Sequence, residues 1–308
     1  MELTPVQQRT LEDLMRRPDL PVFPAGLADR VRADLERRLA PAVEGLRDGE
    51  QIWITKGKLA DLHSRCEGLF LANELGEGVF EFGMRLAVGN LVHRAVQVSV
   101  YRPGLGESDL VATAHEQLCR DDPRFAEFVR TLGEADRAEL EAEAVRQTVL
   151  FRATFPPFPR AWTPTVELSL RAELAEGRVV LSARPDIALG RADPDEPMRA
   201  RRLFLELKTG VELPEHDEDL RFYALVATLR FGVPPFRVAT VHLERGSWRA
   251  QDVTEDVLES AARRVGDGYL RASALLGGEE PRLRPGAWCR WCPRSLTCEV
   301  STARGDQS

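Results

Sequence analysis

The sequence predicts an α/β fold in which a helical N-terminal half precedes a mixed sheet flanked by helices. Apolar residues recur at helical spacing through most of the first 150 positions. The proline-rich segment 155–162 then interrupts the chain, and the pattern beyond it changes to the alternation of strands. The elements after this break follow the order β-β-β-α-β with a closing helix, which indicates an α/β core.

The N-terminal helices are predicted from caps and periodicity. Thr4 and Pro5 supply an N-cap and a first helical residue, which predicts a helix through about Arg17. The further helices predicted before the break are 27–46, 58–74, 84–100, 107–131 and 134–150.

The strands follow the break. Ala175-Glu176-Gly177 joins two alternating segments and predicts a β-hairpin. Gly232 ends a helix, and Gly246 lies in the turn of a strand pair. The elements predicted here are hairpin strands at 165–174 and 178–190, a short apolar strand at 201–210, a helix at 216–232, a strand pair at 237–254 and a final helix at 259–276.

Length and composition are those of a globular protein with one large domain or two small ones. The 308 residues are 43% hydrophobic and 30% charged. No apolar run reaches the roughly 18 residues that cross a bilayer. The first residues lack the apolar core of a secretory signal, so we expect a cytoplasmic protein with no membrane association. Because the net charge is −7, any nucleic acid must be bound by a local basic patch, such as 199–202 or 263–264.

Two acids and a lysine lie on adjacent predicted strands. Asp186 is near the end of one strand, and Glu206 and Lys208 share a face of the next. Two such carboxylates can hold a hard divalent cation, and a neighbouring lysine can orient water or stabilise charge on a phosphate. Lysine is rare here, since only Lys56, Lys58 and Lys208 occur among 42 basic residues. The alternative is an ordinary surface strand, but its apolar neighbours predict burial, where an unpaired charge is costly.

These residues resemble the signature of the PD-(D/E)XK nuclease superfamily, specifically its RecB-like branch. The matching segments are Pro185-Asp186, Glu206-Leu207-Lys208-Thr209-Gly210 and Gly89-Asn90-Leu91-Val92-His93. The resemblance implies a restriction-endonuclease-like core, with Lys208 as the catalytic lysine. The Mg²⁺ or Mn²⁺ ligands that it implies are His93, Asp186, Glu206 and the Leu207 carbonyl. A nitrogen ligand among oxygens suits Mn²⁺ as well as Mg²⁺, whereas His93 taken alone would be an ordinary histidine.

The branch also carries a Gln and, four residues later, a Tyr on the helix after this strand. Tyr223 fits the second position, where it is expected to be catalytic or to contact DNA, with core packing as the alternative. Asp219 stands in place of the Gln. Because a carboxylate cannot donate a hydrogen bond and repels phosphate, DNA contact by Asp219 is in question. Alternatively, the Asp219 side chain pairs with Arg221 or Lys208, or is simply solvated.

Three cysteines near the C-terminus form a C-x₂-C-x₅-C pattern, at Cys289, Cys292 and Cys298. A zinc or iron–sulfur site normally takes four ligands, and Cys66 is the expected fourth. The odd total of five cysteines and the lack of a secretion signal argue against a disulfide framework. Cys119 is expected to be a buried small hydrophobe.

This split order resembles the iron–sulfur subgroup of RecB-like nucleases, which includes the AddB nuclease domain and the CRISPR-adaptation nucleases. There, one cysteine precedes the catalytic histidine and three follow the last core elements. The resemblance implies a [4Fe-4S] cluster on Cys66, Cys289, Cys292 and Cys298, whereas composition alone leaves Zn²⁺ open. Such a site would tie the N-terminal helices to the C-terminal segment, so metal binding would contribute to folding.

The expected organisation is an N-terminal helical extension at 1–57, a nuclease domain with its C-terminal cysteine-rich segment at 58–300, and a disordered tail at 301–308. The implied activity is metal-dependent hydrolysis of DNA, with exonuclease action on single-stranded DNA or DNA ends favoured. The candidate DNA contacts are Asp219, Tyr223, Arg201 and Arg202. The sequence has no P-loop, so any unwinding requires a helicase partner. DNA repair, CRISPR and defence proteins are the other expected partners.

Two rival hypotheses stay open. The first is a nucleic-acid-binding module of the same fold that no longer cuts, although the complete set of Asp186, Glu206 and Lys208 argues against it. The second is an assembly protein whose cysteines hold structural zinc.

Overall fold

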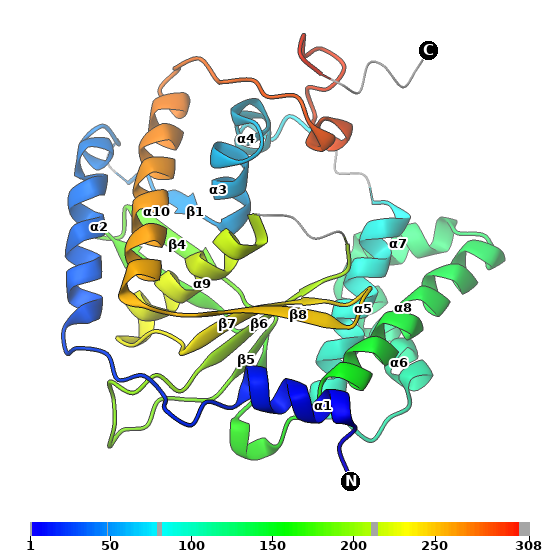
Figure 1. Ribbon diagram of the computed structural model, residues 1–308. Helices are drawn as coiled ribbons and strands as arrows, with labels where there is room; N and C mark the ends of the chain where they lie inside the picture. Colours follow the sequence, from blue (N-terminus) through cyan, green and yellow to red (C-terminus); the bar gives the residue numbers. More distant parts are fainter. Residues whose placement is uncertain (1, 48, 79–81, 211–214, 302–308) are drawn as a thin grey trace.

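The computed structural model describes residues 2–47, 49–78, 82–210 and 215–301. Two β-sheets and the surrounding helices make up a mixed α/β fold, as predicted (Figure 1). Buried side chains from the N-terminal helices, both sheets and the C-terminal helix pack into one continuous core. The N-terminal segment is therefore part of the same core as the sheets.

The larger sheet has five strands in the order β2-β5-β6-β7-β8. Its strands are β2 (Thr165–Val166), β5 (Ile187–Leu189), β6 (Leu203–Lys208), β7 (Arg237–His242) and β8 (Ser247–Asp252). β6 and β7 are parallel, and the other neighbours are antiparallel. A parallel pair needs a crossover connection, which α9 (Glu215–Phe231) supplies. β6 is buried from its first residue to Leu207, as suits the middle strand of the sheet.

The smaller sheet has the order β1-β4-β3, with β1 at Ile52–Ile54, β3 at Leu170–Leu174 and β4 at Val179–Ala183. The predicted hairpin is confirmed for β3 and β4. Its continuation over 165–174 and 178–190 is confirmed too, because β2 and β5 pair with each other in the same register, although they belong to the larger sheet. Glu167 has a φ of 51°, and Pro185 has no N–H to donate, so both arms break between the sheets.

β1 was not predicted, because three residues are too few to show an alternating pattern. It pairs in parallel with β4 and leads directly into α3 (Lys56–His63). The segment 1–57, expected to be helical, thus also contributes a strand.

Two predicted helices are each divided in two. The segment 58–74 forms α3 and α4 (Glu67–Glu74), and 107–131 forms α6 (Glu107–Asp121) and α7 (Pro123–Thr131). The second break lies at Asp122, whose carboxylate accepts from the N–H of Arg124 and caps α7 ahead of Pro123. The other predicted helices are present as α1 (Pro5–Thr10) with a short π-helix, α2 (Leu27–Glu44), α5 (Met84–Tyr101), α8 (Glu134–Thr154) and α10 (Glu255–Leu276).

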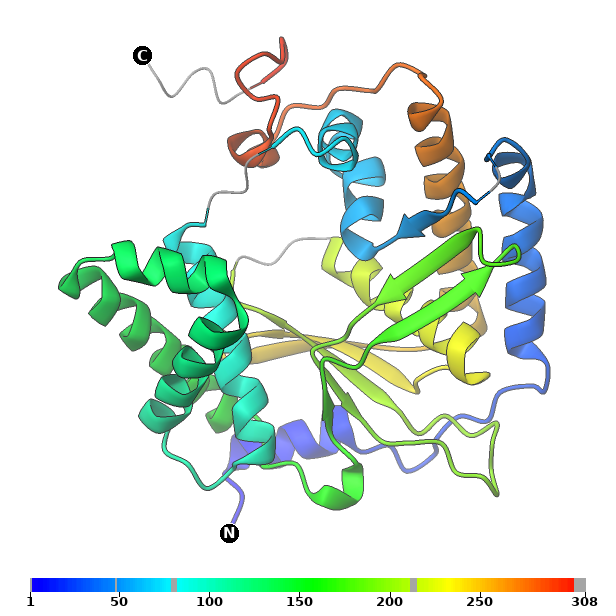
Figure 2. The same ribbon diagram turned by 180° about the vertical axis from the view of Figure 1, so that it is seen from behind.

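The helices cover the sheets in two groups. α5, α6, α7 and α8 form a helical group beside the larger sheet, whereas α2, α9 and α10 pack together on the other side (Figures 1 and 2). α9 contacts β3 and β4 of one sheet and β7 of the other. It is therefore the helix that joins the two sheets.

The C-terminal segment leaves α10 and returns to the region of α4, where it forms a 3₁₀ turn at Ala287–Trp291 (Figure 2). Of the tail expected at 301–308, only Ser301 lies within the described residues. None of the described helices is long and apolar enough to span a bilayer.

Candidate active site

Asp186 and Glu206 are placed side by side by strand pairing. Ile187 of β5 lies opposite Leu205 of β6 in an antiparallel ladder. One step further along this ladder, Asp186 lies beside Glu206. The backbone N–H of Leu207 donates a hydrogen bond of 2.6 Å to Oδ2 of Asp186 and fixes that carboxylate. The two acids are 6% and 3% exposed, so they form a buried pair near the end of β6.

His93 reaches this pair from α5. Its Nδ1 lies 3.2 Å from Oδ1 of Asp186. Gly89, one turn earlier, permits the close approach of α5, because a Cβ there would lie 3.2 Å from Oγ1 of Thr209. Burial alone would lower the pKa of His93, but Asp186 raises it by its charge and hydrogen bond. The pKa of Asp186 is lowered, because its attraction to His93 outweighs burial. Each side chain thus favours the charged form of the other.

Lys208 lies between two carboxylates. Its Nζ is 3.1 Å from Oε1 of Glu206 and 3.3 Å from Oδ2 of Asp219. Burial alone would lower the pKa of Lys208, but these two acids raise it and keep the side chain as an ammonium ion. Of the alternatives for Asp219, pairing with Lys208 is therefore the one observed, whereas Arg221 pairs with Glu218.

Tyr223 of α9 is a core residue that also faces the site. Only 1% of it is exposed, and it lies close enough to Glu206 for that carboxylate to influence its hydroxyl. Burial and the nearby carboxylates raise the pKa of Tyr223 well above its usual value, so the phenol stays protonated. The core and site interpretations of Tyr223 are thus compatible.

Lys56 is a site residue that the sequence patterns missed. Its Nζ contacts Oε1 of Glu206 and lies 5.1 Å from the centre of the Tyr223 ring. β1 and the hydroxyl of Thr55, which caps α3, place Lys56 at this point. The available signal is the rarity of lysine, since two of the three lysines meet at Glu206.

The donor chemistry at Glu206 suits a divalent cation. Oε2 of Glu206 is buried and has no hydrogen-bond partner within the described part of the chain. A buried carboxylate oxygen without a partner is costly, and hard cations bind such oxygens. The side chains as they stand are not a finished metal cage. Within residues 2–47, 49–78, 82–210 and 215–301, no three His, Cys, Asp or Glu side chains are grouped in metal-binding geometry.

The acids face a cleft of about 1140 Å³ that is lined by α5, by the sheets and by the C-terminal segment. This volume exceeds the roughly 300–1,000 Å³ of ordinary small-molecule pockets. Arg85 and Asn90 line it from α5, and Trp291, 61% exposed, lines it from the cysteine-rich segment. The sequence analysis gave none of these three side chains a role in the cleft, although Asn90 lies in the Gly89–His93 segment and Trp291 lies in the cysteine pattern.

Arg201 and Arg202 do not join this cleft. They precede β6, at the opposite end of the strand from Lys208. Arg201 pairs with Asp193 at 3.0 Å, and the guanidinium of Arg202 lies 4.0 Å from the centre of the Phe231 ring. Burial lowers the pKa of Arg202. These two candidate DNA contacts are thus remote from the buried acids.

The four cysteines of the expected cluster come from both ends of the chain. Backbone N–H groups of Arg284 and Gly286 donate to the Sγ atoms of Cys66 and Cys289, each at 3.5 Å. Burial raises the pKa of the Cys292 thiol, and the other three thiols add to this effect, so all four interact electrostatically. Among the described residues, their side chains are not grouped in metal-binding geometry. Cys119 is half-buried, rather than buried as expected.

The C-terminal segment is fastened to α4 by side chains as well. Glu67, 2% exposed, pairs with Arg271 of α10 at 2.6 Å. Its Oε2 also accepts from the N–H of Arg282 at 2.6 Å. Arg294 pairs with Glu77, just after α4. The cysteine-bearing segment is thus held beside Cys66 by contacts that need no metal.

Comparison with known proteins places this site in a family. The model of the PD-(D/E)XK nuclease superfamily matches residues 62–299. No curated protein matches the chain. Among solved structures, a Eubacterium rectale protein described as a candidate exonuclease shares 15% identity and a TM-score of 0.46, covering 80% of this chain and 88% of its own. Rai1 of Scheffersomyces stipitis shares 10% identity and a TM-score of 0.28, covering 83% and 68%. The family match extends over most of the chain and includes both acids, so this chain belongs to the PD-(D/E)XK nuclease superfamily.

Proposed function

We propose that this protein is a divalent-cation-dependent deoxyribonuclease that acts as an exonuclease on single-stranded DNA or DNA ends. The supporting observation is the juxtaposition of Asp186, Glu206 and Lys208 near the end of β6 in a chain of this superfamily. The groups needed for phosphodiester hydrolysis thereby lie together near one end of β6.

The cation would be Mg²⁺ or Mn²⁺. The residues that would hold it are His93, Asp186, Glu206 and the carbonyl of Leu207. The unpartnered Oε2 of Glu206 is the strongest local support for this assignment. When bound, such a cation supplies Lewis acidity and a water nucleophile at neutral pH.

The chain's own side chains would perform the remaining tasks. Lys208 is charged and would orient the attacking water or stabilise charge on the phosphate. Asp219 holds the Lys208 ammonium at 3.3 Å, so it would position the lysine rather than contact DNA. Tyr223 keeps its proton beside Glu206 and would be available as a hydrogen-bond donor in the site. Lys56 balances the charge of Glu206 before a cation arrives.

The cleft suits a segment of polymer better than a single small molecule. Its volume is about 1140 Å³, and Arg85 lies on its wall as a cation for backbone phosphates. Trp291 presents an exposed indole on which an unpaired base could stack. DNA binding should therefore weaken as salt concentration rises.

The cysteines would hold a [4Fe-4S] cluster, with Zn²⁺ as the alternative. Supporting this are the electrostatic proximity of the four thiols and the N–H donors on Cys66 and Cys289. Hydrogen bonds to cluster sulfurs are a usual feature of iron–sulfur sites. Metal analysis and the visible spectrum of anaerobically purified protein distinguish the two metals.

The decisive experiment is cleavage of end-labelled single- and double-stranded DNA with Mg²⁺ or Mn²⁺. We expect wild-type protein to shorten labelled strands. Lys208→Ala and Asp186→Asn should each reduce the rate by about 10²–10⁴-fold, whereas the surface change Asp34→Asn should not. Equal cleavage by wild type and Asp186→Asn would assign the activity to a contaminant. DNA binding by the wild type with no cleavage under any of these conditions would favour the non-cleaving module.

A further inference from the structure

A second cavity lies at the other end of the central strand from the acids. Its volume is about 530 Å³, within the roughly 300–1,000 Å³ range of small-molecule sites. Leu203, the first residue of β6, lines it. Leu203 and Lys208 are five residues apart on β6, which is about 16 Å along the strand. We call this cavity the distal pocket, and none of the described residues that line it also lines the cleft at the acids.

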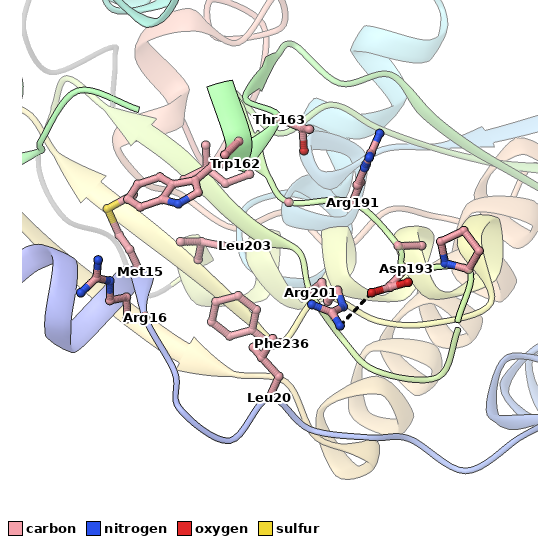
Figure 3. Close-up of a pocket in the computed structure, with 15 residues that line it drawn as sticks. Met15, Arg16, Leu20, Trp162, Thr163, Arg191, Asp193, Arg201, Leu203 and Phe236 are labelled. Carbon is pink, nitrogen blue, oxygen red and sulfur yellow. Dashed lines mark ion pairs between the residues drawn. The ribbon is translucent and has the colours of Figure 1, made fainter. Parts of the chain in front are cut away.

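The walls of the distal pocket are apolar and partly aromatic (Figure 3). Leu189, Leu203 and Phe236 are buried, at 5%, 2% and 4% exposure. Trp162 and Met15 are half-buried, and both line the pocket. Such a lining favours a flat ring, because indole and phenyl faces stack on other planar groups.

The charges around the pocket are mainly positive. Arg16, Arg191 and Arg201 line it, whereas Asp193 is its only lining acid in the described chain. Asp193 is already paired with Arg201 at 3.0 Å. Arg16 and Arg191 are exposed and make no ion pair with any described residue. The unbalanced guanidinium groups therefore favour an anionic ligand.

Two polar atoms at the pocket lack partners. Oγ1 of Thr163 and Nε of Arg201 are buried and make no hydrogen bond within the described residues. Thr163 also has a φ of 45°, which is costly for a β-branched residue. The backbone N–H of Gly190 donates to the Trp162 carbonyl at 2.7 Å, which holds this turn on the pocket wall. A strained residue with an unused hydroxyl is thus fixed at the cavity.

We propose that the distal pocket is a second, non-catalytic binding site for a nucleoside monophosphate. The base would lie against Trp162, the phosphate would pair with Arg191 or Arg16, and the Thr163 hydroxyl would bond the base or sugar. The ligand is either a free mononucleotide or the terminal nucleotide of a strand, which share this chemistry. The site requires no cleavage, so its test is independent of the proposed nuclease activity.

Binding is measured by calorimetry without added divalent cation, on the full chain. The probes are dAMP, deoxyadenosine, inorganic phosphate and a 5′-phosphorylated oligo(dA). We expect dAMP to bind at least about tenfold more tightly than deoxyadenosine or phosphate, because it uses both the aromatic wall and the guanidinium groups.

Variants assign the binding to this pocket. Trp162→Ala and Arg191→Ala should each weaken dAMP binding at least about fivefold, and the isosteric Thr163→Val should weaken it less. Trp53→Ala and Arg230→Ala, which lie elsewhere, should leave it unchanged. Loss of dAMP binding with unchanged oligo(dA) binding identifies a free mononucleotide as the ligand, and loss of both identifies a strand end. Absence of dAMP binding by the wild type, or equal binding by Trp162→Ala and Arg191→Ala, would overturn the proposal.

Discussion

Lys56 and Glu206 are 150 positions apart in the sequence, yet the ammonium of one contacts Oε1 of the other. The same oxygen accepts from Lys208 at 3.1 Å. One buried carboxylate is thus balanced by two ammonium groups, from β6 and from the N-terminal segment. Because its second oxygen has no partner in the described residues, the side chain is arranged for an additional cation.

This arrangement predicts that Lys56 opposes cation binding. Lys56→Ala removes a positive charge next to Glu206, so Mn²⁺ should bind more tightly, by about tenfold, as calorimetry on the DNA-free protein can measure. Without Lys56, the metal-free protein should also unfold more easily, because Glu206 loses a partner while buried.

Lys58→Ala provides the matched control. Lys58 pairs with Glu74 and has no contact with the acids. Its loss should leave Mn²⁺ affinity unchanged. Weaker Mn²⁺ binding by Lys56→Ala than by wild type would show that Lys56 does not compete with the cation.

The cysteine arrangement gives a second prediction. Cys66→Ala should lose the bound metal and its colour and should melt at a lower temperature, because four ligands from distant parts of the chain would become three. Iron and zinc contents together with a thermal melt provide the measurement.

Cys119→Ala is the control for this prediction, since Cys119 is half-buried on α6 and takes no part in the cluster. It should retain full metal content. A brown, normally folded Cys66→Ala protein would exclude Cys66 as a ligand.

The sequence predicted the fold best where patterns are local. The run that forms β6 and the glycines that end α9 and turn β7 into β8 give local signals, and those elements were found. The hairpin at 165–190 was predicted along its length, but its division between two sheets was not, because strand alternation does not reveal which sheet a strand joins. The sequence patterns also failed to predict strand β1 and the position of Lys56 in the site, for a related reason. A three-residue strand has no period of its own, and its position is set by pairing with β4, far along the chain.

For the site, the sequence identified the chemical groups but only some of their partners. The spacing of Glu206 and Lys208 follows from strand geometry, and the pairing of Asp219 with Lys208 was one of the stated alternatives. The position of Arg201 and Arg202 at the far end of β6 was not foreseen. Basic runs carry no information about which end of a strand they will occupy.

His216 gives a prediction for stability against pH. Burial, with a contribution from Lys208, lowers the pKa of His216 to about 4. The unfolded chain, with a histidine pKa near 6.5, therefore binds more protons than the folded chain between about pH 6.5 and pH 4. Above this window His216 is neutral in both states and does not change the free energy of unfolding. As pH falls through the window, the unfolded chain gains a proton that folded His216 does not, so the folded protein becomes progressively less stable. Urea unfolding of wild type and His216→Gln at pH 7 and pH 5 measures the effect.

Lowering the pH from 7 to 5 should reduce the unfolding free energy of wild type by about 1 kcal/mol more than that of His216→Gln. His115→Gln is the control for replacing a histidine elsewhere in the fold, since His115 lies on α6. A difference for His216→Gln that is equal at both pH values would show that His216 does not titrate in this way.

Trp291 links the cysteine segment to the cleft and gives the last prediction. It is 61% exposed, lines the cleft, and lies between Cys289 and Cys292. Trp291→Ala should weaken binding of a short single-stranded oligonucleotide by about 5- to 100-fold, because base stacking on an aromatic ring contributes about 1–3 kcal/mol. Trp288→Ala is unsuitable as a control, since its Nε1 donates to the Arg284 carbonyl and supports the segment. Trp53→Ala, on β1 and away from the cleft, should bind normally. If Trp291→Ala keeps wild-type affinity at low salt, with metal content unchanged, the indole is no part of the DNA-binding surface and the segment serves the fold alone.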